Sequence, residues 1–280
     1  MNLWERVTLA FQRSDNFKAQ LFAFLGSGEQ NLRGIGGKVI SREDARQLLQ
    51  ELIPTEIQVR AVCQRRLKVV AAAPHVSFDN WSEYFCNRVA RRLKLGWVVA
   101  RNFRDQDPHT IPAPIGRHLH VNRPTESLKP GGEEFFSERA QTAHEKYLES
   151  LAAAAGQAVM PIDLLIEFHS HQRTPKLEIA TVGLSREIAQ EISDTYDQLQ
   201  EKFSLPELAL EPLHSVRMTA EATKKLGSMR TDVSRCSVHI EIPREFRREE
   251  TERRAVCRAL VSIVGHLVDR LPTNAASKSD

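Results

Sequence analysis

Two apolar runs in the sequence each end at a histidine. Leu67 to Ala73 is followed closely by His75, and Ile162 to Phe168 is followed directly by His169-Ser170-His171. If both runs are buried strands of an α/β sheet, their carboxyl ends meet in one crevice, where such sheets place their active sites. Because imidazole is a common zinc ligand, this pattern predicts a zinc site at the ends of the two strands.

A catalytic zinc ion typically takes three ligands from His, Asp or Glu and leaves a fourth position for water. With His75 and His169 as the imidazole ligands, Asp79 lies in the loop or first helical turn after His75, where it can reach the same ion. Glu83 follows Asp79 closely in the sequence and is an alternative acidic ligand. A lone histidine is more often a hydrogen-bonded structural residue, but two at strand ends favour the metal site.

The dipeptide Asn122-Arg123 follows a short strand-like piece, Leu119 to Val121. A guanidinium group binds a carboxylate through two parallel hydrogen bonds, and the neighbouring amide supplies a further donor. The pair therefore suits a substrate with a free carboxylate. The alternative is a structural ion pair between Arg123 and Glu126 or Glu133.

Glu241 lies in a strand-like stretch, Ser237 to Pro243, in which alternation places the aliphatic side chains on one face and His239 and Glu241 on the other. If that face borders the cleft, Glu241 could take a proton from the attacking water and pass it to a leaving nitrogen. The alternative is a carboxylate that faces solvent. His171 is expected to line the pocket, because Gln172 to Pro175 indicates that its strand ends earlier.

These residues, in this order, resemble the zinc carboxypeptidase superfamily, in particular its N-formylglutamate amidohydrolase-like branch, from about Val69 to Leu267. The resemblance implies bound zinc and a substrate, a small molecule or a peptide end, that carries a free carboxylate. Arg117 or Arg104 would polarise the scissile carbonyl or contact the substrate. The remaining roles that it implies are metal ligation by His75 and His169, carboxylate binding by Asn122 and Arg123, and general base catalysis by Glu241.

The sequence departs from the family pattern at two positions. Carboxypeptidases place a glutamate three residues after the first histidine, where this chain has Phe78, and Asp79 comes one residue later. His120 stands where the formylglutamate branch often has an aspartate before Asn-Arg. The acidic ligand, the number of metal ions and the acyl group therefore stay open, and so does a non-catalytic protein that keeps the fold and binds carboxylates.

The elements that must position these residues alternate between strands and helices, which predicts an α/β fold. We expect three α/β/α layers with a mixed, mostly parallel central sheet, as in zinc carboxypeptidases, plus N-terminal helices. The expected division is an N-terminal helical extension over 1–60 and a catalytic domain over 61–275. Helix-like spacing covers residues 2–24 and 43–53, and Ser41 with Asp44 forms a capping-box pattern before the second.

Within the expected catalytic domain, helices are predicted over Trp81–Leu95, Glu133–Ala155, Ser185–Phe203 and Glu249–Leu271, the first of them ended by Gly96. Besides the two histidine-ended runs, strands are predicted over Trp97–Ala100, Leu177–Val182, Ser215–Ala222 and Ser237–Ile242. The long segment from Arg101 to Pro130 has little regular pattern, which is typical of a functional loop.

Composition narrows the class of protein. A net charge of +3 is too small to indicate a polyanion partner, so we expect no nucleic acid and interpret paired arginines such as Arg91-Arg92 and Arg253-Arg254 as solvated helix faces. The scattered cysteines form no metal or disulfide motif. Without an expected signal peptide or membrane span, the chain is predicted to be cytoplasmic. The apolar face of the N-terminal helices could join copies into a homo-oligomer.

Overall fold

The structure is a computed structural model that describes residues 17–33, 39–45, 48, 57–102, 118–127, 132–157 and 159–270. Its contacts divide the chain into two compact units. The first contains Met1–Glu56, Asn102–Leu119 and Thr125–Phe136, and the second contains Ile57–Arg101, His120–Pro124 and Ser137–Asp280. All the described residues with proposed chemistry lie in the second unit.

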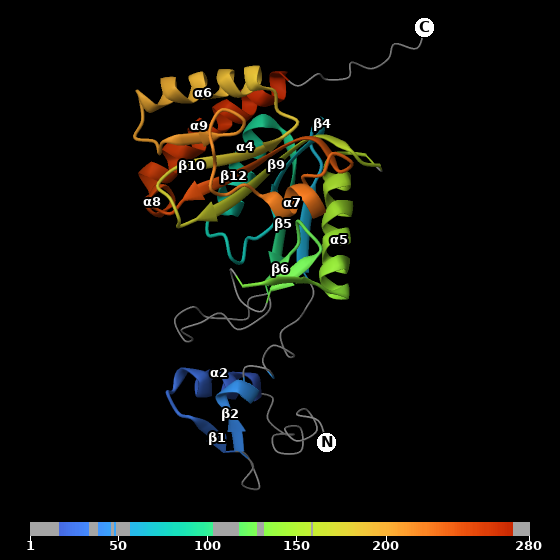
Figure 1. The fold of residues 1–280 in the computed structure, drawn as a ribbon, viewed down its shortest axis with the longest axis vertical. Helices are drawn as coiled ribbons and strands as arrows, with labels where there is room; N and C mark the ends of the chain where they lie inside the picture. Colours follow the sequence, from blue (N-terminus) through green and yellow to red (C-terminus); the bar gives the residue numbers. More distant parts are fainter. Residues whose placement is uncertain are drawn as a thin grey trace. The chain divides into compact units, whose positions relative to one another are not determined.

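The second unit is built on a seven-stranded sheet with the strand order β11-β10-β12-β9-β4-β5-β3 (Figure 1). The central neighbours β12, β9, β4 and β5 are mutually parallel, and β10 is antiparallel to β12. This mixed, mostly parallel sheet confirms the predicted fold class. The strands are β3 (Ile57–Val62), β4 (Arg66–Ala73), β5 (Leu95–Asn102), β9 (Ile162–His171), β10 (Leu177–Val182), β11 (Leu208–Leu210) and β12 (Ser234–Pro243).

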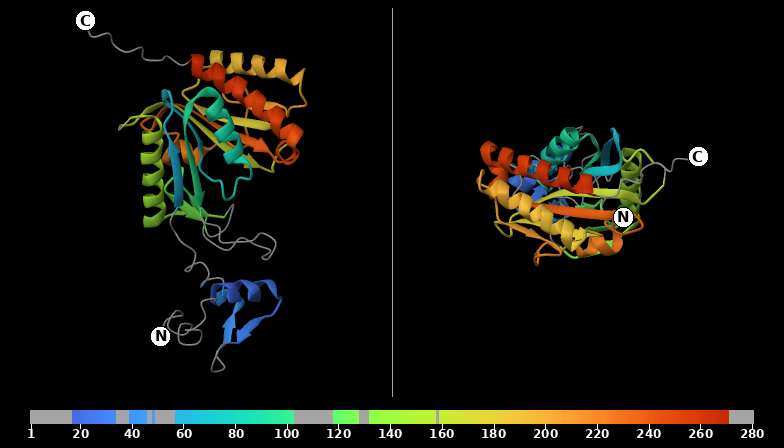
Figure 2. Two further views of the ribbon diagram at one scale, coloured as in Figure 1. Left: turned by 180° about the vertical axis from the view of Figure 1, so that it is seen from behind. Right: turned by 90° about the horizontal axis from the view of Figure 1, so that it is seen from above.

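Helices cover both faces of this sheet (Figures 1 and 2). On one face, α4 (Ser82–Leu93), α6 (Arg186–Gln200) and α9 (Glu250–Arg270) enclose the main hydrophobic core. On the other face, α5 (Glu138–Ala154) packs against β3 and β4. Two short helices, α7 (Glu221–Leu226) and α8 (Glu245–Arg248), lie on either side of β12 in the sequence.

Strand alternation separates the core face from the site face. In β9, Leu164, Ile166 and Phe168 belong to the core that the three helices enclose. The intervening Glu167 and His169 therefore point to the opposite face. The same alternation in β12 directs the aliphatic side chains into the core and His239 and Glu241 to the site face, as the sequence predicts.

Several predicted strand boundaries are wrong for identifiable reasons. β9 continues to His171 instead of ending at Phe168, because its pairing with β12 extends to Pro243. The segment predicted as a strand over Ser215–Ala222 is irregular before α7. There, the Glu178 carboxylate accepts the backbone N–H groups that a strand partner would otherwise take, those of Arg217 and Met218.

Two predicted helix boundaries also shift. The helix expected from Glu133 begins after Ser137, whose hydroxyl accepts the N–H of Ala140, and the preceding residues form β8 (Glu134–Phe136). Gly96 does not end α4, which ends at Leu93 and is followed by Lys94 in a left-handed conformation (φ 60°). Gly96 instead lies in β5, where a Cβ atom would sit 2.0 Å from the Ala154 carbonyl oxygen. That glycine serves a close approach between backbones.

The first unit contains α2 (Phe17–Gly26), an antiparallel pair of β1 (Asn31–Arg33) and β2 (Val39–Ser41), and the pairing of β7 (Thr125–Ser127) with β8. β6 (His118–His120) precedes the segment that carries Asn122. The predicted capping box is present: the Ser41 hydroxyl accepts the Asp44 N–H, and the Asp44 carboxylate accepts the Ser41 N–H. The helices predicted over 2–24 and 43–53 lie partly outside the described residues. Among the described helices, none has the length and apolar character that crossing a bilayer requires.

Candidate active site

The ends of β4 and β9 bring His75, Asp79 and His169 together. The two strands are adjacent and parallel, so their carboxyl ends lie at one edge of the sheet. A tight turn after β4, in which the Asp79 N–H donates to the His75 carbonyl at 2.7 Å, returns Asp79 toward the histidines. Asp79 Oδ2 lies 3.6 Å from His75 Nδ1 and 2.9 Å from His169 Nδ1. Glu83 is directed elsewhere, into an ion pair with Arg101.

These three side chains have the chemistry that a divalent metal ion requires. Two imidazole nitrogens and a carboxylate oxygen, from His75, His169 and Asp79, all lie within 4.8 Å of one another. Tetrahedral zinc with metal–ligand bonds of about 2.0–2.1 Å separates its ligand atoms by roughly 3.3–3.4 Å. The distances of 3.6 and 2.9 Å fall on either side of that value, so small side-chain movements would fit the group to an ion.

The charges of this group are balanced by direct contacts between its side chains. Burial opposes protonation of His169, but hydrogen bonds to Asp79 and Glu167 outweigh it and raise its pKa to about 10. Burial also opposes ionisation of Asp79, yet hydrogen bonds from His169 and His75 hold its pKa well below the usual range. Burial lowers the pKa of His75. These contacts favour an ion pair between His169 and Asp79.

Glu241 lies beside this group on the neighbouring strand. In the parallel register of β9 and β12 it is paired with His169, so both side chains point to the same face. His239 Nε2 donates to Glu241 Oε1 at 3.1 Å, and the His239 ring stacks on that of His169 with centroids 3.9 Å apart. Glu241 Oε2 is buried and accepts no hydrogen bond from the described residues. Oε1 is therefore held in place by His239, while Oε2 is left without a hydrogen-bond donor among the described residues.

Glu167 is a central residue of the site that the sequence reasoning missed. Its side chain is fully buried, and Oε1 accepts hydrogen bonds from Tyr147 Oη at 2.9 Å and Ser228 Oγ at 2.6 Å. Asn122 Nδ2 donates to Oε2 at 3.1 Å, and His169 Nε2 lies 3.5 Å from the same oxygen. Burial opposes ionisation, but hydrogen bonds from the adjacent imidazoles hold the pKa of Glu167 well below its usual range.

Glu167, His169 and His239 also offer ligand atoms within 4.8 Å of one another. The oxygens of Glu167 already accept hydrogen bonds from three other side chains. Its carboxylate therefore organises the site, and the group that contains Asp79 is the better metal-binding candidate. The sequence carries one signal for Glu167: it is a charged residue inside an apolar run, and such a residue is rarely buried unless its charge has partners.

Asn122 and Arg123 are fixed by contacts within the same network. Asn122 is fully buried, and its Oδ1 accepts a hydrogen bond from Arg123 Nη1 at 3.3 Å. Thr223 Oγ1 lies 3.4 Å from the same guanidinium nitrogen. A Cβ atom on Gly227 would lie 2.0 Å from the Asn122 carbonyl oxygen, so only glycine permits this packing. The amide of Asn122 thus orients Arg123, which is partly exposed.

The other predicted binding residues do not join the group. Both ring nitrogens of His171 are engaged by the following turn: Nε2 donates to the Lys176 carbonyl at 3.1 Å, and Nδ1 accepts the Arg173 N–H at 3.2 Å. These contacts indicate a structural role instead of the predicted pocket lining. Arg104 and Arg117 lie outside the described residues.

Comparisons with known proteins find similar proteins only among solved structures. No family model matches the chain, and no curated protein sequence matches it. Among solved structures, the chain is similar to a gene product from Agrobacterium tumefaciens (14% identity, covering 76% of this chain and 94% of that chain, TM-score 0.42). A bacteriophage poly-gamma-glutamate hydrolase (11%, 76% and 90%, TM-score 0.48) and a metallo-carboxypeptidase from Burkholderia cenocepacia (12%, 91% and 69%, TM-score 0.38) are also similar. The chemistry of the site follows from the chain's own residues.

Proposed function

We propose that this protein is a zinc-dependent hydrolase that cleaves an amide bond in a substrate with a free carboxylate. The substrate would be an N-acyl amino acid, such as N-formylglutamate, or a peptide end. The observation that carries the proposal is the position of Glu241, register-paired with His169 and with a buried oxygen that accepts no hydrogen bond from the described residues. A metal-binding group with an adjacent carboxylate base is an arrangement suited to metal-assisted amide hydrolysis.

Each side chain would have a separate task. His75, Asp79 and His169 would hold the zinc ion, which supplies positive charge that lowers the pKa of a water molecule and polarises a carbonyl. Glu241 would take the proton from the attacking water and deliver it to the leaving nitrogen, which makes that nitrogen a neutral amine. His239, through its hydrogen bond to Oε1, keeps the Glu241 carboxylate oriented toward the reacting atoms.

Substrate selection would depend on Arg123. Its guanidinium group would bind the free carboxylate through two hydrogen bonds and place the scissile amide at the metal site. The Asn122 amide accepts from Arg123 on one side and donates to Glu167 on the other, so it restricts the position of the guanidinium group. A fixed cation of this kind favours substrates by charge as well as by shape.

The proposal is tested by the metal content of the purified protein. We expect about one equivalent of zinc in the wild type, a large loss in His75→Ala and His169→Ala, and no loss in Glu83→Ala, the matched control. Glu83 is a suitable control because it is an acidic residue in the same part of the chain but pairs with Arg101. Equal zinc content in all four proteins would rule out this site.

A second candidate function is a carboxylate-binding protein without catalysis. The observation that favours it is the 2.9 Å contact between His169 and Asp79, through which the two side chains satisfy each other directly. Under this alternative, binding of an N-acyl amino acid would survive removal of metal by a chelator and would still be lost in Arg123→Ala. Hydrolysis that stops with the chelator and returns with zinc would favour the enzyme.

A further inference from the structure

Arginines from two helices gather around one surface cavity of about 990 Å³. α4 and α9 are neighbours in the layer that covers the core face of the sheet. We refer to this cavity as the arginine groove. Its basic residues are Arg88, Arg91, Arg92, Arg254 and Arg258, and its lining contains no acidic residue. From the sequence we expect such arginines on separate solvated helix faces, but the fold brings those of α4 and α9 to one place.

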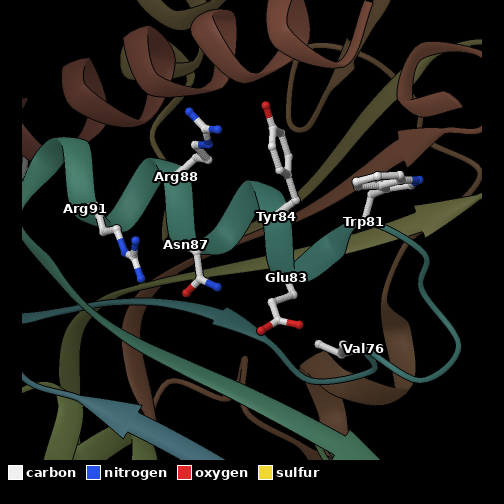
Figure 3. Close-up of a pocket in the computed structure, with 7 residues that line it drawn as sticks. All are labelled: Val76, Trp81, Glu83, Tyr84, Asn87, Arg88 and Arg91. Atoms are coloured by element: carbon white, nitrogen blue, oxygen red, sulfur yellow. The ribbon is translucent and has the colours of Figure 1, made fainter. Parts of the chain in front are cut away.

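The arginine groove is separate from the candidate active site. Its helices pack on the core face of the sheet, whereas Glu167, His169 and Glu241 point to the opposite face. A smaller cavity of about 410 Å³ shares Tyr84, Arg88 and Arg91 with the groove and is also lined by Glu83. Figure 3 shows Tyr84 and Arg88 pointing to one side of this helix and Arg91 to the other.

Most of these guanidinium groups have no carboxylate partner in the part of the chain that the structure describes. All five arginines are exposed, and Arg254 forms an ion pair with Glu250. The remaining four make no salt bridge to a described acidic residue. Several positive charges in one concave site repel one another, and a multivalent anion would relieve that repulsion. The charge of the groove therefore favours a ligand with several closely spaced negative charges.

The aromatic residues of the groove indicate what kind of anion fits. The Arg88 guanidinium carbon lies 5.1 Å from the ring centroid of Tyr84, and that of Arg258 lies 5.2 Å from the ring centroid of Phe203. Because these rings already carry guanidinium groups on their faces, they do not form open platforms on which nucleic-acid bases could stack. Compact phosphate groups, which guanidinium forks bind through paired hydrogen bonds, suit the groove better.

We propose that the arginine groove binds a short phosphate chain, either free or as part of a nucleotide. The test is a calorimetric titration of the full chain with inorganic tripolyphosphate at about 0.15 M salt, where exposed charges are well screened. We expect saturable binding, with the dissociation constant raised about tenfold in Arg91→Gln and in Arg258→Gln, since each substitution removes a charged hydrogen-bond donor. The control is Arg65→Gln, which removes an exposed arginine outside the groove and should bind as the wild type does.

Titrations with ATP and citrate test whether the groove recognises a phosphate chain or any anion with several charges. Comparable binding of ATP supports the proposal, because tripolyphosphate and ATP share the phosphate chain. Citrate bound as tightly as tripolyphosphate would overturn it in favour of a general anion site. Absence of tripolyphosphate binding, an equal loss in Arg65→Gln, or binding of an oligonucleotide without tripolyphosphate would each overturn it too. Thermal unfolding of every variant verifies that the substitutions at these exposed positions leave the protein folded.

Discussion

Replacement of Glu167 by glutamine should destabilise the protein strongly. The substitution keeps the size of the side chain and lets one oxygen continue to accept from Tyr147 and Ser228. The new amide nitrogen then faces the amide of Asn122, at the position where Oε2 accepted a hydrogen bond at 3.1 Å. Two donors oppose each other there, and His169 loses the anion that lies 3.5 Å from its Nε2.

The expected cost can be worked from these contacts. A hydrogen bond to a charged group contributes about 1.5–3 kcal/mol, and leaving a buried partner of a charge pair unpaired costs about 3–5 kcal/mol. Because the glutamine retains part of the network, we expect the Glu167→Gln variant to lose about 3 kcal/mol of unfolding free energy. Urea denaturation followed by circular dichroism measures this loss, with an unchanged denaturant slope if the native fold is retained.

A control on the same strand separates this effect from a general loss of charge. Asp163 also lies in β9, but it forms an ion pair with Arg235 at 3.2 Å near the surface. Surface ion pairs contribute about 0–1 kcal/mol, so Asp163→Asn should have a small effect. If Glu167→Gln costs no more unfolding free energy than Asp163→Asn, then the buried Glu167 carboxylate does not organise the site.

Three further predictions concern catalysis, binding and pH. Glu241→Gln should keep its zinc but lower kcat by about 10²–10⁴-fold, and a loss of metal would contradict its role as base. Arg123→Ala should raise KM for a carboxylate substrate while an amide analogue is unaffected, so equal losses on both would contradict the clamp. Burial lowers the pKa of His144 below its usual value of 6.5. The unfolded chain therefore binds a proton more readily than the native protein, so the free energy of unfolding falls as the pH is lowered below 6.5. His144→Asn should reduce that pH slope by up to about 1.4 kcal/mol per pH unit in urea titrations, and an unchanged slope would count against this assignment.

The sequence predicted best those features of the candidate site that depend on local patterns, such as the alternation of side chains along a strand. The apolar run before His75 predicted where β4 stops, although β9 continues past its predicted end to His171. Strand alternation predicted that His239 and Glu241 share a face. The choice between Asp79 and Glu83 could not be made from spacing, because both lie within reach of a turn. The structure brings Asp79 to the histidines and pairs Glu83 with Arg101.

Features that depend on long-range contacts could not be predicted in this way. The partners of Glu167 come from three distant segments, at Asn122, Tyr147 and Ser228, and their convergence is a property of the tertiary fold. The arginine groove is similar, since residues of α4 and α9 become neighbours only when both helices pack on the sheet. Short-range patterns carry no information on which distant segments meet.

The parallel register between β9 and β12 links the packing of the core to the arrangement of the candidate site. Glu241 faces the same way as His169 only while these two residues are paired, because side chains alternate between the faces of a sheet. A slip of one residue in either strand would turn the proposed base into the hydrophobic core and expose aliphatic side chains on the site face. Misregistered molecules would therefore lose the proposed base and the packing of the core together.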